Sequence, residues 1–206
     1  ATPPADEDEA YVSLDADFLG KRDHVKILAG IIAGKASYPP RKAMTILCGQ
    51  IFVIDDVTKT FMNIDVIHQI GNLESEAVRT RAVEASVEGN IFLVMHPLDV
   101  LVSRVENYRG MQEKQNRNGL RQIELSIEVA KRYILEAIKR NEGIAIKAIE
   151  KIAETARSPA GIFARKHGAE IYEAIAPEAL QVNIKNKNFL SKRLPILISE
   201  IDKFAK

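Results

Sequence analysis

The sequence has little cysteine and no long hydrophobic run, and each lack excludes a class of protein. Its single cysteine, Cys48, cannot form a disulfide within the chain, and we expect a buried structural thiol. No run of roughly 18 apolar residues is present, so no membrane span is expected. No secretory signal peptide opens the chain. A cytoplasmic protein, kept in a reducing compartment, is therefore expected.

The charge is nearly balanced over the chain but differs between its halves. The 206 residues carry a net charge of +1, with 46% hydrophobic and 28% charged residues, typical of one or two soluble globular domains. Residues 1–103 hold 15 acidic and 9 basic residues, whereas residues 104–206 hold 13 acidic and 20 basic. One interpretation is that the acidic half holds a metal and the basic half binds an anionic substrate. The alternatives are that the two halves simply attract each other, or that their charges are solvated.

The hydrophobic spacing predicts an α+β fold. Strands are predicted over residues 11–20, 43–47, 50–54, 60–67 and 90–95, the last of them buried. Helices are predicted over residues 21–34, 74–86, 97–109, 119–141, 143–157, 160–175 and 189–204. Pro195 marks a kink in the last helix or its true start. We therefore expect a small mixed sheet with helices over residues 1–95, followed by an all-α helical domain over residues 96–206.

Two carboxylates, Asp15 and Asp17, interrupt the first apolar run, Y-V-S-L-D-A-D-F-L-G. Residues two apart on a strand share a face, so the two side chains are expected to project together. Like charges this close repel each other, and a hard divalent cation such as Mg²⁺ or Mn²⁺ would remove the repulsion. The alternative is a face that is open to water and carries a solvated pair.

A third carboxylate, Asp65, stands in the run F-M-N-I-D-V-I-H between two β-branched residues. An isolated carboxylate in such a run is costly to bury unless it is paired or ligates a cation. Residues 55–59 are expected to form the hairpin turn that precedes this strand. Three carboxylates on adjacent strands can hold two Mg²⁺ ions for phosphoryl transfer, and we predict that Asp15, Asp17 and Asp65 converge.

These motifs resemble those of the DNA polymerase beta-type nucleotidyltransferase superfamily, and more narrowly its uncharacterised bacterial members with a helical C-terminal domain, which are distant relatives of abortive-infection toxins. The residues concerned are L-D-A-D-F-L-G (14–20), N-I-D-V-I-H (63–68) and V-M-H-P-L-D-V-L-V-S-R-V-E-N (94–107), within a span of about residues 11–135. The resemblance implies that Asp15 and Asp17 ligate the metals, and that Asp65 completes the site and acts as general base. The reaction would be attack of an acceptor hydroxyl on the α-phosphorus of a nucleoside triphosphate.

One departure from the family pattern concerns the nucleotide cradle. The superfamily carries a Gly-Ser or Gly-Gly turn upstream of its Asp-x-Asp motif, but no glycine precedes Gly20 here, and the sequence begins at Ala1 without an initiator methionine. Either the start of the domain is missing, or the cradle has been lost.

Three basic residues near the junction of the two halves, Arg104, Lys114 and Arg117, are candidates for contact with the phosphates of the nucleotide. The alternative for each is a solvated surface cation. The acceptor, whether a small molecule, RNA or protein, is not indicated, and a homo-oligomer is possible. A different class of function is a non-catalytic helical protein that binds a partner protein or nucleic acid, with vestigial carboxylates.

Overall fold

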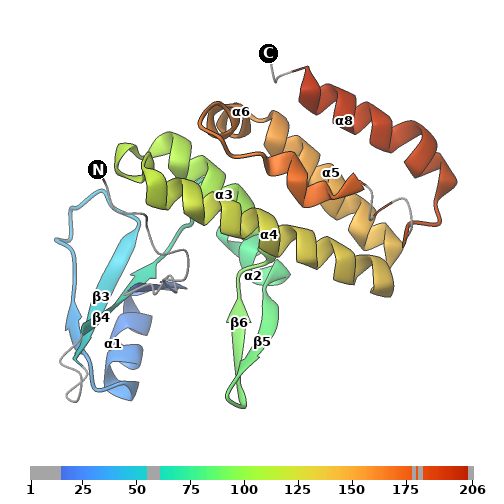
Figure 1. Cartoon of the computed structure of the whole chain (residues 1–206). Helices are drawn as coiled ribbons and strands as arrows, with labels where there is room; N and C mark the ends of the chain where they lie inside the picture. Colours follow the sequence, from blue (N-terminus) through green and yellow to red (C-terminus); the bar gives the residue numbers. More distant parts are fainter. Residues whose placement is uncertain (1–14, 55–60, 178–179, 181–182, 204–206) are drawn as a thin grey trace, which may run out of the picture. The chain divides into compact units, whose positions relative to one another are not determined.

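The chain forms two compact units, Ala1–Ile70 and Gly71–Lys206, in a mixed α+β structure. A computed structural model describes residues 15–54, 61–177, 180 and 183–203 (Figure 1). The expected turn at residues 55–59 lies outside this range. Within it, no helix has the length and apolar character needed to cross a membrane.

The first unit is a four-stranded sheet with one helix against it. Its sheet has the order β1-β4-β3-β2, in which β1 runs parallel to β4 and the other neighbours are antiparallel. The elements are β1 (Asp15–Leu19), α1 (Arg22–Ile31), β2 (Lys35–Ser37), β3 (Leu47–Ile54) and β4 (Phe61–Ile67). Strand β2 lies in a stretch without a strand signal. The strand expected over 43–47 is wrong except for Leu47, where β3 begins, and the strand expected over 50–54 lies within β3.

One face of this sheet forms the core of the first unit. Ile51, Ile64 and Val66 are buried there together with Val25 and Ala29 of α1. These sheet residues alternate along their strands with residues of the opposite face, which include Gln50 and Asp65. The opposite face, called the polar face below, also carries the exposed apolar residues Phe52 and Ile54.

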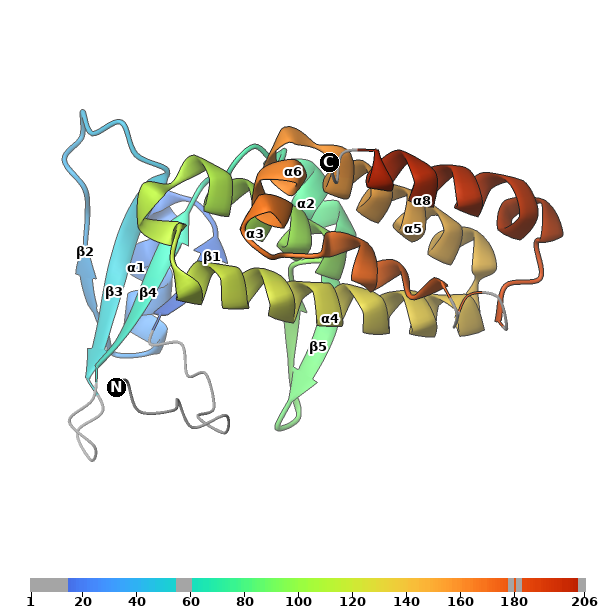
Figure 2. The same ribbon diagram turned by 45° about the horizontal axis from the view of Figure 1, so that its top comes forward.

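The second unit is mainly helical (Figures 1 and 2). It contains α2 (Ser75–Arg81), β5 (Val83–Val87), β6 (Asn90–Val94), α3 (Pro97–Gly110), η1 (Gln112–Lys114), α4 (Arg117–Arg140), α5 (Glu142–Arg157), α6 (Pro159–Lys166), η2 (Ile171–Ile175), the π-helical η3 (Phe189–Arg193) and α8 (Leu194–Asp202). Both views show α4 beside α3 and α5.

Polar residues fix the helix starts of this unit. The side-chain oxygen of Asn116 accepts a hydrogen bond from the backbone of α4, and Asn141 does the same for α5. Ser158 caps α6, with Pro159 at its first position. Pro195 is the second residue of α8, which continues directly from the π-helical segment Phe189–Arg193. A proline inside a helix lacks the N–H of an intrahelical hydrogen bond, and here the helix changes from π to α just before it.

The core of the second unit is made of isoleucine, leucine and many alanines. Six alanines of α5 and α6 are buried: Ala145, Ala148, Ala153, Ala156, Ala160 and Ala164. Alanine side chains are short, so helices that meet through them can pack closely. Larger residues such as Ile123 and Ile152 are fully buried and fill the space between α4 and α5.

The boundary between the units lies between Ile70 and Gly71, whereas the sequence analysis placed it at residues 95–96. A buried carboxylate explains why α2 belongs with the helices. Asp99 of α3 is only 5% exposed, and it accepts two hydrogen bonds from Arg81 of α2, from Nε at 2.9 Å and from Nη2 at 3.0 Å. This bidentate ion pair ties the helix before the β5–β6 hairpin to the bundle.

Two predictions for this segment are wrong. The helix expected over residues 74–86 ends at Arg81, and Val83–Val87 pair with β6 as strand β5. The described elements within residues 96–206 are all helical, as expected for that range. The strand expected over residues 90–95 exists as β6, but every one of its residues is exposed instead of buried. Its apolar residues meet no core, because β6 is paired with β5 alone among the described strands.

We expect Arg81→Leu to destabilise the second unit by about 2 kcal/mol, because it leaves the buried Asp99 carboxylate without its guanidinium. Adding Asp99→Asn should recover part of this loss. Arg79→Leu is the matched control on the same helix, since its exposed pair with Glu76 spans 3.8 Å and should contribute under about 0.5 kcal/mol. Denaturant unfolding followed by circular dichroism measures all three, and equal losses for the two arginine variants would contradict a structural role for the Arg81–Asp99 pair.

Candidate functional site

The polar face of the first unit brings two of the predicted carboxylates into register. Asp17 of β1 stands directly beside Asp65 of β4, and Asp65 stands beside Gln50 of β3. Two residues earlier on both strands, Asp15 is in register with Asn63. Neighbours in register point to the same side of a sheet, so this face places Asp17, Asp65 and Gln50 in one row.

Amide groups surround the Asp65 carboxylate. Its Oδ1 accepts hydrogen bonds from Gln50 Nε2 at 3.0 Å and from Asn63 Nδ2 at 2.6 Å. Both donors contact the same oxygen, which leaves Oδ2 as the oxygen suited to a cation or a proton. The two amides therefore hold the carboxylate in one orientation.

The side-chain oxygen of Asn63 is the feature of this cluster that indicates a bound cation. Because its Nδ2 donates to Asp65, its Oδ1 is fixed in orientation, and that oxygen is buried without a hydrogen-bond partner among the described residues. A buried amide oxygen of this kind is costly unless it is paired, and it is a suitable ligand for Mg²⁺. The side-chain oxygens of Asn63, Asp65 and Asp17 are of the kind that a hard divalent cation prefers.

The third predicted ligand, Asp15, is placed only by its backbone, in register with Asn63. A search of the described side chains, to which that of Asp15 does not belong, finds no group of three histidine, cysteine or acidic side chains that could hold a metal ion. The convergence of Asp15 with Asp17 and Asp65 stays a prediction.

The same polar face continues toward the other edge of the sheet. Phe52 of β3 is in register with Asn63 on one side and with Lys35 of β2 on the other. The ring of Phe52 is 37% exposed, and Lys35 is exposed as well. An exposed aromatic ring and a cation therefore lie in the row that also contains Asp15.

The three predicted phosphate-binding cations all belong to the second unit. Arg104 of α3 donates from Nη1 to Oε1 of Gln122 at 3.0 Å, which links α3 to α4. Lys114 ends η1 and is half-buried, and Arg117 begins α4 and is exposed. Arg104 has a clear structural role, and phosphate contact by all three stays a prediction.

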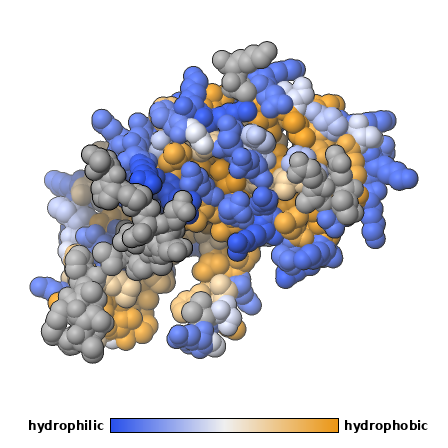
Figure 3. Space-filling model, viewed as in Figure 1, coloured by the Kyte–Doolittle hydropathy of each residue, from blue (hydrophilic) through white to orange (hydrophobic). Residues whose placement is uncertain are grey.

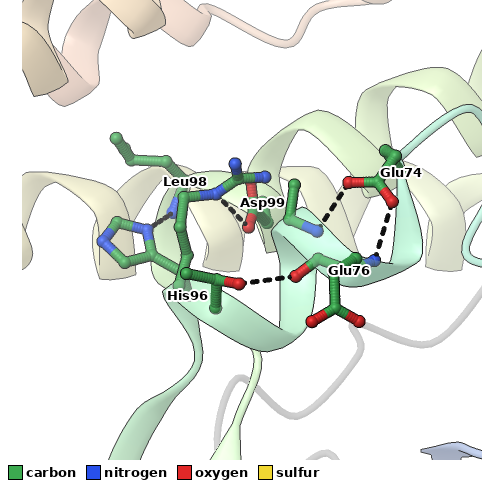
Figure 4. Close-up of polar contacts among 8 residues, drawn as sticks. Glu74, Glu76, His96, Leu98 and Asp99 are labelled. Atoms are coloured by element: carbon green, nitrogen blue, oxygen red, sulfur yellow. Dashed lines mark hydrogen bonds and ion pairs between the residues drawn. The ribbon is translucent and has the colours of Figure 1, made fainter.

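The stretch V-M-H-P-L-D, part of the resemblance, has structural roles in the second unit (Figure 4). His96 caps α3, because its Nδ1 accepts a hydrogen bond from the backbone N–H of Leu98 at 3.2 Å. Asp99 binds Arg81, and Glu74 caps α2 through the N–H groups of Glu76 and Ala77. This cluster joins two helices.

Burial lowers the pKa of His96 below its ordinary value of 6.5. The nearby Asp99 carboxylate opposes this shift, and the Arg81 guanidinium adds to it. The hydrogen bond to Leu98 requires a neutral ring with a free Nδ1 lone pair, so the capping role and the lowered pKa agree.

Sequence reasoning missed Gln50, Asn63, Phe52 and Lys35 as neighbours of the carboxylates. Asn63 could have been found, because it lies two residues before Asp65 and so shares its face. Gln50, Phe52 and Lys35 depend on the register of β2, β3 and β4, which no local pattern fixes.

Comparison with known proteins gives no relative: no family model, no curated protein and no solved structure matches the chain.

We expect the free energy of unfolding to decrease as the pH falls below about 6.5, because the unfolded state then binds a proton that folded His96 resists. The contribution of neutral His96 is present above the unfolded-state pKa and is lost as the pH falls through the lower folded-state pKa. His96→Asn keeps a capping acceptor without titrating in this range. Denaturant unfolding at about pH 7.5 and about pH 5.5 should show a flatter dependence for the variant. The other three of the four histidines are common to both proteins, so equal slopes would contradict the role of His96.

Proposed function

We propose that the protein is a metal-dependent nucleotidyltransferase that transfers a nucleoside monophosphate from a nucleoside triphosphate to an acceptor hydroxyl. The observation that carries this proposal is the register of β1 and β4, which sets Asp17 beside Asp65 on one sheet face, with Asp15 two residues before Asp17 on the same strand. The buried, unpartnered Oδ1 of Asn63 supports a cation at this place.

In this proposal Asp15, Asp17 and Asp65 hold Mg²⁺ or Mn²⁺, with Asn63 Oδ1 as an additional oxygen ligand. The bound metal supplies charge neutralisation for the triphosphate and for the leaving pyrophosphate. Asp65 takes the proton of the acceptor hydroxyl as that oxygen attacks the α-phosphorus. Gln50 and Asn63 hold Oδ1 of Asp65 by hydrogen bonds, so Oδ2 is the oxygen that receives the proton.

The rest of the polar face supports a place for the nucleoside. Phe52 presents a partly exposed ring in the row that contains Asp15 and Asn63, and Lys35 stands beyond it at the sheet edge. Every nucleobase has a face that stacks on an aromatic ring, so this contact requires no particular base. We assign the base to Phe52 and an accessory polar contact to Lys35.

We expect millimolar Mn²⁺ or Mg²⁺ to raise the melting temperature of the wild-type protein by roughly 5 °C, because an ion that binds only the folded state stabilises it. Asp15→Asn combined with Asp17→Asn should abolish this shift and leave the far-ultraviolet circular dichroism unchanged. Asp23→Asn, which removes an exposed carboxylate from α1, is the control and should keep the shift. A wild-type protein without any metal response would overturn the metal site.

The sequence contains no tryptophan, so a single tryptophan introduced at position 52 would report on the nucleoside contact by its fluorescence. We expect the fluorescence of a Phe52→Trp variant to be quenched saturably by Mg²⁺ with a nucleoside triphosphate, and Phe52→Ala to weaken nucleotide affinity roughly tenfold through lost stacking. Phe18→Trp is the control of similar exposure, 40% against 37%, on the opposite face of the same sheet. Equal quenching at both positions would reject Phe52 as the base contact.

A further inference from the structure

The hairpin β5–β6 of the second unit carries an apolar strand without any cover (Figures 1 and 3). Four consecutive residues are exposed: Ile91 by 69%, Phe92 by 46%, Leu93 by 73% and Val94 by 40%. Consecutive strand residues point to opposite faces, so neither face of β6 is buried. Figure 1 shows the hairpin extending away from the helices of its own unit, and Figure 3 shows hydrophobic residues over much of its visible surface. Single exposed apolar residues are ordinary, but a contiguous group of large ones indicates an interaction site.

Apolar residues occupy both faces of this hairpin. Residues directly opposite each other in an antiparallel pair share a face. One face has four apolar residues, Val83, Ala85, Phe92 and Val94. The other has Ile91 and Leu93 opposite Ser86 and Glu84. An isolated two-stranded hairpin is marginally stable in water, so further strands would stabilise it.

The two edges of the hairpin differ in charge. Strand β5 carries Glu84, and Glu88 follows it in the turn, whereas residues 90–95 carry no charge, no proline and no glycine. Proteins commonly protect exposed strand edges with charged residues, proline or bulges. The β5 edge has such protection and the β6 edge has none, so β6 is the edge suited to pairing.

The turn determines which backbone groups of β6 face outward. Glu88 and Gly89 both have positive φ, 50° and 80°, as a two-residue type I′ turn requires. The flanking pair Val87·Asn90 is then hydrogen-bonded, and hydrogen-bonded pairs alternate from there. By this count Ile91 and Leu93 direct their N–H and C=O groups toward the free edge.

We propose that β6 pairs antiparallel with β6 of a second copy of this chain, about a two-fold axis at Phe92. Ile91 of one copy then exchanges two backbone hydrogen bonds with Leu93 of the other, and the converse pair does the same. This register sets Ile91 against Leu93 and Phe92 against Phe92, and it opposes no like charges. The contact uses the same residues of both copies, so it closes as a dimer with a four-stranded sheet.

A site-directed crosslink tests this register. Phe92 faces Phe92 of the second copy in a non-hydrogen-bonded pair, whose Cα atoms lie about 4.5 Å apart, within reach of a disulfide. We expect Phe92→Cys, in a Cys48→Ala background, to form covalent dimers on oxidation. Ser86→Cys in the same background, on the exposed β5 strand, should not.

The oligomeric state provides the second measurement. Light scattering after size exclusion should give a dimer mass for the wild-type chain and a monomer mass for Leu93→Lys. The new cation lies opposite Glu84, so the hairpin itself should persist, and unchanged circular dichroism checks this. A monomeric wild-type chain, or equal crosslinking at residues 86 and 92, would overturn the proposal; a monomer that instead captures an extended apolar peptide would assign the edge to a different protein.

Discussion

The parallel pairing of β1 with β4 is the constraint on which the candidate site of the first unit depends. Side chains alternate along each strand, so the register that buries Ile64 and Val66 against α1 also brings Asp65 beside Asp17 on the other face. A shift of one residue in either strand would place a carboxylate in the core. Burial of the apolar face therefore fixes the relative position of the two carboxylates more firmly than any contact between them.

The polar face gains its organisation from amides as well as acids. Gln50 and Asn63 both donate to one oxygen of Asp65, which holds the carboxylate in one orientation. In the second unit a carboxylate has a different role: Asp99 is buried and fully engaged by Arg81, which makes it a link between helices. Asp65 thus accepts the two amide hydrogen bonds at Oδ1 alone, whereas both oxygens of Asp99 bind Arg81.

Local patterns in the sequence predicted most helices and the polar character of the candidate site. Asp17 and Asp65 could be placed on adjacent strands because each interrupts an apolar run with a period of two. Gln50 and Phe52 could not be linked to them, since their neighbours depend on pairing between strands. The helix expected over 74–86 failed because its alanines favour a helix, whereas the Glu88-Gly89 turn and the pairing with β6 decide for a strand. The prediction that β6 is buried was wrong because an apolar run does not determine which other residues pack against it.

The buried alanines of α5 and α6 limit how this bundle can change. Ala148, Ala153 and Ala160 lie in its core, and a methyl group has no rotamer to reorganise. Such a contact forms with little loss of side-chain entropy, but it cannot absorb an added carbon by rotating aside. A larger side chain at one of these positions would therefore have to displace its neighbours, whereas an exposed position on the same helix has room for it.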